Sequence, residues 1–477
     1  MKKHLFFLMA VAMVAAAGLV SCTNEILNEE ESSQGCRIVI PVHAASTKAV
    51  TVDETAHTST AIFKTDENVY IYNVTKSTLD DAVLHPSTEG SSTTLEGTPN
   101  KEYESSDEVQ VLYNTDAAGV VDYTAQDGSI EKVTDAGTGI VSITGISGGV
   151  ISTTSTTLEN LQSIYRLTFK YGVNTLNVRS VVITSMGGKL QTSYNVVDGS
   201  ATYGPVIASS STSHAHLYVA LRFASNPDDN ILFQVIDENG KVYTGTKQAP
   251  AGGFTNGILY AATISVTPHV FSVSADRQVY IAPGNLGKDG STYSFIEPYG
   301  NWGFGGGAPK EQTKTAYFSW TAANGQSTIY GIPGWSILSS AEWDYLTGIS
   351  NIVDTKRPMN EGVERCYIVK TSGKYGLLIP PDAATSADVA GLSAYSNQNP
   401  YNEANYIDYV AKGFAFLEAT GGYQSAWDNA DQVFCWSSTK YNDSNFYFLR
   451  VRLQNSKPDL QITVGNSRSY PARLVHD

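Results

Sequence analysis

The sequence predicts a mainly β protein in which two β-sandwich lobes are followed by an α+β C-terminal domain. Short runs of alternating apolar and polar residues recur through the first 267 residues, separated by loops rich in Ser, Thr and Gly. Such runs are typical of strands, and the charged fraction of 16% with 28 Tyr suits a secreted β protein. All six Trp lie after residue 268, which indicates a separate domain with a large aromatic core.

The first 21 residues predict a secretory signal. Lys2 and Lys3 precede an apolar run over residues 5–20, which is shorter than the ~20 residues that a membrane span needs. The ending Leu19-Val20-Ser21-Cys22 resembles a bacterial lipobox, and this resemblance implies cleavage before Cys22 and a lipid such as palmitate on its thiol. An ordinary signal peptide with an incidental cysteine is the alternative. The lipid would place the protein at the cell outer membrane.

The rest of the chain divides into four further parts. A strand from Arg37 to Val42 is expected near its start, followed by a break of small residues at 46–50. The expected parts are the signal at 1–21, a tether with a first strand at 22–47, a first lobe at 48–150, a second lobe at 151–267 and the C-terminal domain at 268–477.

Each lobe contains several strand patterns and nothing with a convincing helical period. Asn239-Gly240 between two apolar runs predicts a tight hairpin in the second lobe. The expected strands are 69–72, 109–113 and 140–144 in the first lobe, and 167–171, 178–183, 217–223 and 231–236 in the second.

Two short helices are expected in the C-terminal domain. Ser339 and Glu342 have the spacing of a capping box before Trp343, so a helix begins there. Residues 403–412 predict a second helix, which Gly413 would end before a strand at 414–417.

Charge and motifs argue against nucleic acid binding and catalysis. The net charge of −15 opposes a nucleic-acid partner, which requires a basic face. Residues 145–149 match G-x-S-x-G, but the β-like residues that follow cannot form the helix that a nucleophile elbow needs. His214 and His216 could face one side of a strand, but a third metal ligand is not near. We therefore expect neither an enzyme nor a metal or cofactor site.

The cysteines leave two alternatives open. Beyond Cys22, the chain contains Cys36, Cys366 and Cys435. Cys366 and Cys435 could pair as a disulfide in an oxidising compartment, or both could be buried thiols.

Several segments of residues 37–267 resemble one known family. The segments 63–72, 158–169, 178–190 and 252–260 are similar, in order and spacing, to those of fimbrillin-like proteins, the subunits of type V pili. The resemblance implies two transthyretin-like β-sandwich lobes and assembly with other pilus subunits by strand addition. It also implies proteolysis that removes the first strand. The basic candidates for the cut are Lys48, which lies in the looser segment, and Arg37.

The last third resembles a domain of surface lipoproteins that is related in fold to C-type lectins. The similar segments are 271–275, 279–286, 334–338, 376–380, 435–439 and 469–475. The relation implies a glycan or protein ligand at loops of this domain, with ordinary polar loops as the alternative. Asp428, Asn429 and Asp431 could also supply oxygen ligands to calcium. The candidate ligand-binding residues are Trp427, Asp428, Asn429, Tyr441, Asn442, Asp443, Asn445, Asn466 and Arg468.

Together these resemblances lead us to expect a cell-surface adhesin that is the tip subunit of a type V pilus. The sequence stops straight after the last expected strand, which leaves no donor strand for a further subunit. A permanently lipid-anchored, glycan-binding surface lipoprotein and a structural pilus subunit without a ligand are the alternatives.

Overall fold

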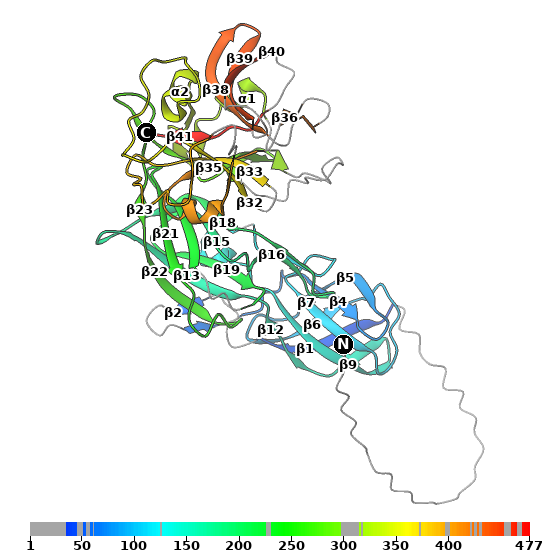
Figure 1. The fold of residues 1–477 in the computed structure, drawn as a ribbon. Coiled ribbons are helices and arrows are strands. Elements are labelled where there is room, and N and C mark those ends of the chain that lie inside the picture. The colour runs from blue at the N-terminus through cyan, green and yellow to red at the C-terminus, as the bar shows by residue number, and fades with distance from the viewer. Residues whose placement is uncertain are drawn as a thin grey trace, which may run out of the picture.

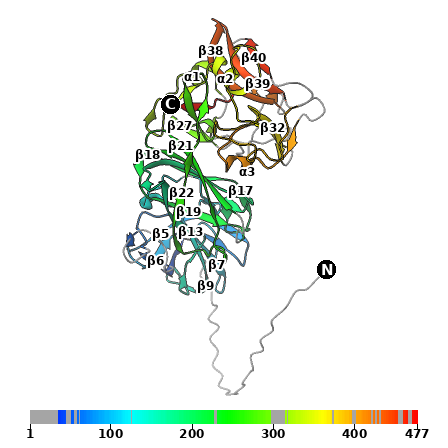
Figure 2. The same cartoon turned by 60° about the vertical axis from the view of Figure 1, so that its left-hand side comes forward.

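The protein is elongated and mainly β, as the sequence predicts. In the computed structural model the N-terminal strands (blue) and the C-terminal strands (orange to red) lie at opposite ends (Figures 1 and 2). No helix in the part that the structure describes is long and apolar enough to cross a membrane. That part comprises residues 35–44, 51–53, 58–60, 62–124, 126–225, 230–296, 314–315, 318–371, 374–395, 401–419, 422–423, 427–428, 432–452, 459–464 and 470–477.

The first lobe is a sandwich whose strands close into a ring. The pairing order is β10-β1-β6-β5-β4-β7-β9, and β9 pairs again with β10. The long strands β5 and β9 each pair in both halves, so they form the corners between two sheets. The strands are β1 (Arg37–His43), β4 (Val69–Asn73), β5 (Thr78–Pro86), β6 (Ser92–Gly97), β7 (Glu108–Tyr113), β9 (Gly137–Ser147), β10 (Val150–Thr153), β11 (Thr156–Thr157) and β12 (Glu159–Asn160), with a separate hairpin of β2 (Thr51–Asp53) and β3 (Thr58–Thr60).

The second lobe packs two sheets around one apolar core. One sheet has the order β14-β13-β19-β16-β17, with β22 on β13 and β8 on β16, and the other has the order β18-β15-β20-β21-β23. The predicted hairpin at Asn239-Gly240 joins β20 and β21, and Gly240 adopts the positive φ of +84° that the turn requires. The strands are β8 (Val120–Asp122), β13 (Ser163–Tyr171), β14 (Asn174–Thr175), β15 (Val178–Ser185), β16 (Leu190–Asn195), β17 (Ala201–Tyr203), β18 (Val206–His214), β19 (Leu217–Phe223), β20 (Asn230–Asp237), β21 (Val242–Gln248), β22 (Leu259–Ser265) and β23 (Thr267–Pro268).

The two lobes exchange segments across the expected boundary at residue 150. β10 begins at Val150 and pairs with β1 of the first lobe, so the first sheet system runs on to β12. In return, β8 and the 3-10 turn at Ile130–Lys132 lie with the second lobe, where Val121 and Tyr123 join its core. The chain therefore leaves the first lobe after β7 and returns to it with β9. A single cut point in the sequence does not capture this arrangement.

The C-terminal part combines several short sheets with three helices in its described residues. The helices are α1 (Trp320–Asn324), α2 (Ser340–Thr347) and α3 (Tyr406–Val410). The strands are β24 (Phe271–Ser272), β25 (Gln278–Ile281), β26 (Asn285–Asp289), β27 (Thr292–Ile296), β28 (Lys314–Thr315), β29 (Thr328–Ile329), β30 (Ile332–Pro333), β31 (Ser336–Ile337), β32 (Tyr367–Thr371), β33 (Lys374–Ile379), β34 (Asn402–Glu403), β35 (Ala415–Glu418), β36 (Gly422–Tyr423), β37 (Trp427–Asp428), β38 (Gln432–Asn442), β39 (Asn445–Arg452), β40 (Asp459–Val464) and β41 (Leu474–His476).

Local sequence signals predicted two of the three helices in the described residues of this part, α2 and α3, but not α1. The capping box is present, because Ser339 Oγ accepts from Glu342 N and the Glu342 carboxylate accepts from Ser339 N. The second predicted helix, residues 403–412, is shorter: β34 uses residues 402–403 in pairing with β32, and Asn405 caps α3. The expected aromatic core is confirmed, since Trp335, Trp343 and Trp436 are fully buried.

The second lobe and the C-terminal part pack against each other through strand β20. Ile231, Phe233 and Val235 of β20 point into the core of the second lobe. The alternate residues Leu232 and Ile236 point the other way, into apolar clusters of the C-terminal part. Because β20 is buried on both faces, it is an inner layer of the molecule.

Candidate functional site

The first strand, β1, occupies an internal position in the first lobe. It pairs in parallel with β10 on one side, with Arg37 opposite Val150, and antiparallel with β6 on the other, with Ile40 opposite Leu95. Ile38, Ile40 and Val42 are fully buried and belong to the lobe's core. The period-2 pattern of the sequence thus puts three apolar side chains in a row along one slot between two neighbouring strands.

One residue weakens the hydrogen-bonding ladder of β1. Pro41 lies opposite Thr94 in the register of β1 and β6. Proline has no N–H to donate, and it is usually confined to edge strands for that reason. β1 is therefore an inner strand whose ladder lacks one donor.

The two predicted cleavage positions differ in what they would release. Arg37 is the first residue of β1: its backbone N–H donates to Gly149 O at 2.9 Å, and its guanidinium pairs with Glu96 at 2.8 Å. A cut after Arg37 would leave residues 38–43 in the sheet. Lys48, like the lipidation candidate Cys22, lies outside the described residues, but it follows β1 in the chain, so a cut there would release the whole strand.

A second candidate surface is the hairpin of β38 and β39 at the opposite end of the molecule (Figures 1 and 2). Its turn brings together four of the predicted ligand-binding residues, Tyr441, Asn442, Asp443 and Asn445. The Tyr441 side chain is 55% exposed and meets Tyr447 edge to face at 5.8 Å between ring centroids.

The turn itself is held by short-range hydrogen bonds. Asn442 Oδ1 accepts from Ser444 N at 3.0 Å and from Asn445 Nδ2 at 2.9 Å. The amide oxygen of Asn442 is thus engaged within the turn, while the Tyr441 ring is presented to solvent. An exposed aromatic ring on a fixed turn is a feature of recognition surfaces.

The other face of the hairpin carries an aromatic stack that sequence reasoning missed. Trp320 of α1 stacks on Phe446 at 4.4 Å and 13°, and its Nε1 donates to Ser437 O at 2.7 Å. Lys440 Nζ lies 5.4 Å from the Trp320 ring centroid. Trp320 is more than a hundred positions from these hairpin residues, so no local pattern could have associated it with them.

The remaining predicted ligand-binding residues are not brought to this turn by described contacts. Trp427 and Asp428 form β37, which pairs with β36. Asn429, Asn466 and Arg468 lie outside the described residues. Their role stays a prediction.

The structure shows Cys366 and Cys435 as free thiols, with Cys435 buried and Cys366 half-buried. Burial raises the pKa of both Cys366 and Cys435 to about 12, so neither is a reactive thiolate. Cys435 instead accepts a hydrogen bond from the backbone N–H of Arg473 at 3.2 Å.

Metal-ligand geometry does not occur in the described part of the chain, where no group of three or more His, Cys, Asp or Glu side chains could hold an ion. His216 Nδ1 lies 2.8 Å from Thr168 Oγ1. His214 and His216 therefore form no such group with described residues.

Comparison with known proteins gives structural matches only. No protein-family model matches the chain, and no curated protein matches its sequence. A protein provisionally assigned to cell adhesion, from Bacteroides uniformis, matches at 14% identity and a TM-score of 0.31 over 49% of this chain and 95% of its own. A fimbrial assembly protein from Parabacteroides distasonis matches at 10% identity and a TM-score of 0.28 over 51% and 94%.

The tip fimbrial protein Mfa3 from Porphyromonas gingivalis, with a C-terminal truncation, matches at 11% identity and a TM-score of 0.22 over 46% of this chain and 84% of its own. These similar structures are thus named for cell adhesion or for fimbriae.

Proposed function

We propose that this chain is a fimbrial adhesin of the cell surface. In this proposal the first lobe joins the chain to another pilus subunit by strand exchange, and the β38–β39 hairpin binds a glycan or protein ligand. Lipid on Cys22 serves export. The proteins matched above are named for fimbriae or cell adhesion, and the proposal agrees with those names without resting on them.

The position of β1 carries the proposal. It is the first described strand, it fills an inner slot between β10 and β6, and three fully buried side chains hold it there. Loss of β1 would expose two unpaired strand edges and an apolar row with the spacing of alternate residues. Those are the two features that an incoming β-strand recognises.

A place at the tip of a pilus fits two further features. β41 pairs with β25 on one side and β31 on the other, so this strand is used inside its own chain. The exposed hairpin turn lies at the end of the molecule opposite β1 (Figure 1). The assembly slot and the binding surface are therefore spatially separate.

Strand exchange can be tested with a shortened chain that begins at residue 49 and a labelled peptide of residues 37–43. We expect the peptide to bind the shortened chain and not the full mature chain, because β1 already fills the slot there. A peptide with Ser at positions 38, 40 and 42 is the matched control and should not bind. Equal binding of both peptides would contradict the proposed slot.

Processing can be tested on cells by intact-mass analysis of the surface protein. We expect the mass of a chain that starts at residue 49. The substitution Lys48→Ala should prevent this cleavage. A mature mass that keeps residues 22–48 with lipid would instead favour the permanently anchored lipoprotein.

Ligand binding can be tested with the full chain on glycan and matrix-protein arrays. Tyr441→Ala should weaken the binding found there by about tenfold, the scale of an exposed aromatic contact. Val173→Ala is a matched control, because Val173 is 90% exposed but belongs to the second lobe. Retained binding in Tyr441→Ala would remove the hairpin turn as the site, and no binding to any array would favour a purely structural subunit.

A further inference from the structure

Two histidines lie where the second lobe meets the C-terminal part, and both contact the β20–β21 hairpin. The His476 ring packs on Gly240 at the turn of that hairpin, and its Nε2 lies 2.9 Å from Pro333 O. The His269 ring packs on Gly413, and its Nε2 lies 2.7 Å from Thr244 Oγ1 of β21. At each glycine an added Cβ would overlap the ring, so both imidazoles are closely packed.

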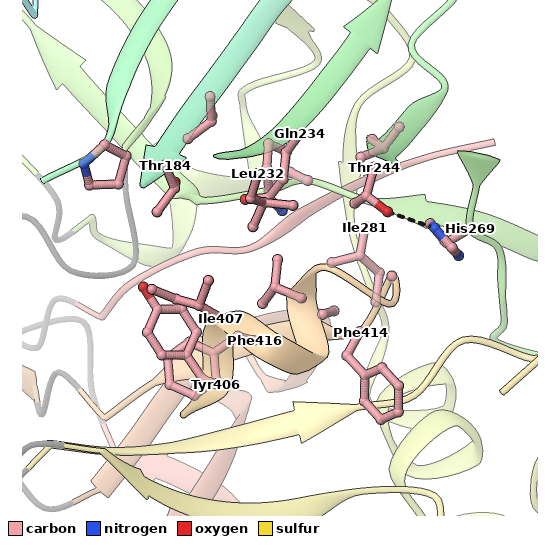
Figure 3. Close-up of a pocket in the computed structure, with 18 of the residues that line it drawn as sticks. Thr184, Leu232, Gln234, Thr244, His269, Ile281, Tyr406, Ile407, Phe414 and Phe416 are labelled. Carbon is pink, nitrogen blue, oxygen red and sulfur yellow. Dashed lines mark hydrogen bonds between the residues drawn. The ribbon is translucent and has the colours of Figure 1, made fainter. Parts of the chain in front are cut away.

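His269 lies at a nearly filled cavity between the two parts. Figure 3 shows the strands of the second lobe on one side, helix α3 on the other, and the His269–Thr244 hydrogen bond at the edge. The cavity has a volume of about 40 Å³ and is lined by apolar residues such as Leu232, Ile407 and Phe416. That space holds about one water molecule, and His269 itself is half-buried, so solvent stabilises a charge on its ring less well than bulk water does.

The groups around His269 offer no counter-charge for an imidazolium. The described lining of the cavity includes no carboxylate, and its other charged or titratable side chains are Arg473 and Tyr406. Arg473 is buried and already donates to Asn285 Oδ1 at 3.0 Å, to Ala282 O at 2.8 Å and to Phe416 O at 2.7 Å. A fixed cation at the same cavity disfavours a second one.

Two charged residues on neighbouring segments are engaged elsewhere. Asp382 donates its backbone N–H to Val270 O, but its carboxylate accepts from Ser272 and Arg357. Lys412 directs its Nζ to Asp388 O at 3.0 Å. Neither residue lines the cavity.

We propose that the joint between the second lobe and the C-terminal part is acid-sensitive, and that His269 is the group that makes it so. The closed joint favours the neutral His269 ring, whereas the opened joint exposes the ring to water, where it binds a proton more readily. Acidification therefore favours opening of the joint and would change the angle between the first lobe and the β38–β39 hairpin. Burial lowers the pKa of His269 below its usual 6.5, which agrees with this direction.

The sign and size of the effect follow from proton linkage. A histidine whose pKa is lower in the closed state leaves the joint fully stable above about pH 6.5, and stability falls as the pH drops below that value. Between pH 7.5 and 5.0, a ring that stays neutral when closed raises the opening equilibrium by up to about 30-fold.

Hydrogen exchange of the full chain, expressed as protection factors at pH 7.5 and 5.0, tests this. We expect protection in β21 and residues 411–416 to fall at pH 5.0 by up to about 30-fold, while β4 and β7 of the first lobe serve as an internal reference. His269→Gln, or His269→Asn if the first variant is unstable at pH 7.5, should abolish the fall. His476→Gln, at the same hairpin, should keep it.

Three results would overturn the proposal. The first is an equal fall in the wild type and in both His269 variants. The second is a fall that disappears in His476→Gln instead. The third is an equal fall in β4 and β7, which would indicate loss of stability throughout the chain.

Discussion

At the scale of single residues, a buried carboxylate in the first lobe holds a loop against strand β5. Asp80 of β5 is fully buried, and its oxygens accept from the backbone N–H groups of Ala82, Asn100 and Lys101 and from the Tyr103 hydroxyl. An unpaired buried carboxylate is expensive, so these four hydrogen bonds are what make the position tolerable. They tie β5 to the loop that follows β6.

Asp80→Ala should destabilise the first lobe by about 3 kcal/mol, because it removes the acceptor of one buried N–H group, that of Ala82, and of two part-buried ones, those of Asn100 and Lys101. Tyr103→Phe removes only one of the four donors and should cost about 1 kcal/mol. Urea unfolding followed by circular dichroism checks both values. Equal effects of the two substitutions would show that the carboxylate does not organise the loop.

At this scale the sequence shows which side chains share one face of a strand, but it does not show which groups those side chains contact. Asp80, Ala82 and Leu84 alternate along β5 and share one face, and all three are buried. Nothing local distinguishes Asp80 from the exposed Asp81 in its need for donors, since those come from residues 100–103. Tyr441, Asn442, Asp443 and Asn445 lie together at the β38–β39 turn because they are close in sequence, and their role in ligand binding stays a prediction. Trp320 was missed because its contact is made only by the fold.

At the scale of elements, the β20–β21 hairpin has more than one task. Its turn residue Gly240 adopts φ +84° and contacts the His476 ring, so the same glycine serves the turn and the joint. Gly188 in the turn between β15 and β16 also has a positive φ, +70°, but nothing lies within 4 Å of its added Cβ. A comparison of substitutions at the two glycines therefore distinguishes the cost of backbone strain from the cost of overlap with a packed side chain.

Gly240→Ala should cost about 2–4 kcal/mol, from the left-handed backbone and the overlap with the imidazole. Gly188→Ala should cost only the backbone contribution of about 1–2 kcal/mol. Thermal unfolding of the two variants under one buffer condition gives the comparison. If the Gly188 variant were as unstable as the Gly240 variant, the His476 contact would contribute nothing.

The positions of strands in the sequence could be predicted better than the strands with which they pair. The strand at residues 37–42 was expected, yet its position between β10 and β6 depends on a partner more than a hundred residues away. The run Ile-Leu-Phe-Gln-Val-Ile at 231–236 did contain a usable signal. It is apolar on both faces rather than alternating, which is typical of a strand covered on both sides.

At the scale of the whole molecule, the second lobe and the C-terminal part behave as one packed unit. Ile236 and Val242 lie in the cluster that contains Trp335 and Trp436. From the other side, Tyr330 adopts a positive φ of +54°, and its hydroxyl reaches Ser180 and Ser209 of the second lobe. We therefore expect these two parts to unfold together.

Ile236→Ala should lower the stability of that unit by about 2–4 kcal/mol, because the side chain is fully buried. All six Trp lie after residue 268, so tryptophan fluorescence reports unfolding of the C-terminal part alone. A substitution before residue 268 should nevertheless shift that fluorescence transition. Ile71→Ala, in the separate core of the first lobe, is the control and should shift it less. An unmoved transition in Ile236→Ala would mean that the two parts unfold independently.

The double burial of β20 also restricts how such a protein can be recombined in evolution. A gene fusion that transfers residues 268–477 to another anchor would leave behind the side chains of Leu232, Ile236 and Val242, which complete apolar clusters of the transferred part. The smallest segment that can be exchanged as a folded unit therefore includes β20 and β21, whose side chains pack into the C-terminal part. The turn between β38 and β39 can therefore vary without disturbing this packing, whereas replacement of the C-terminal part must include the strands that pack against it.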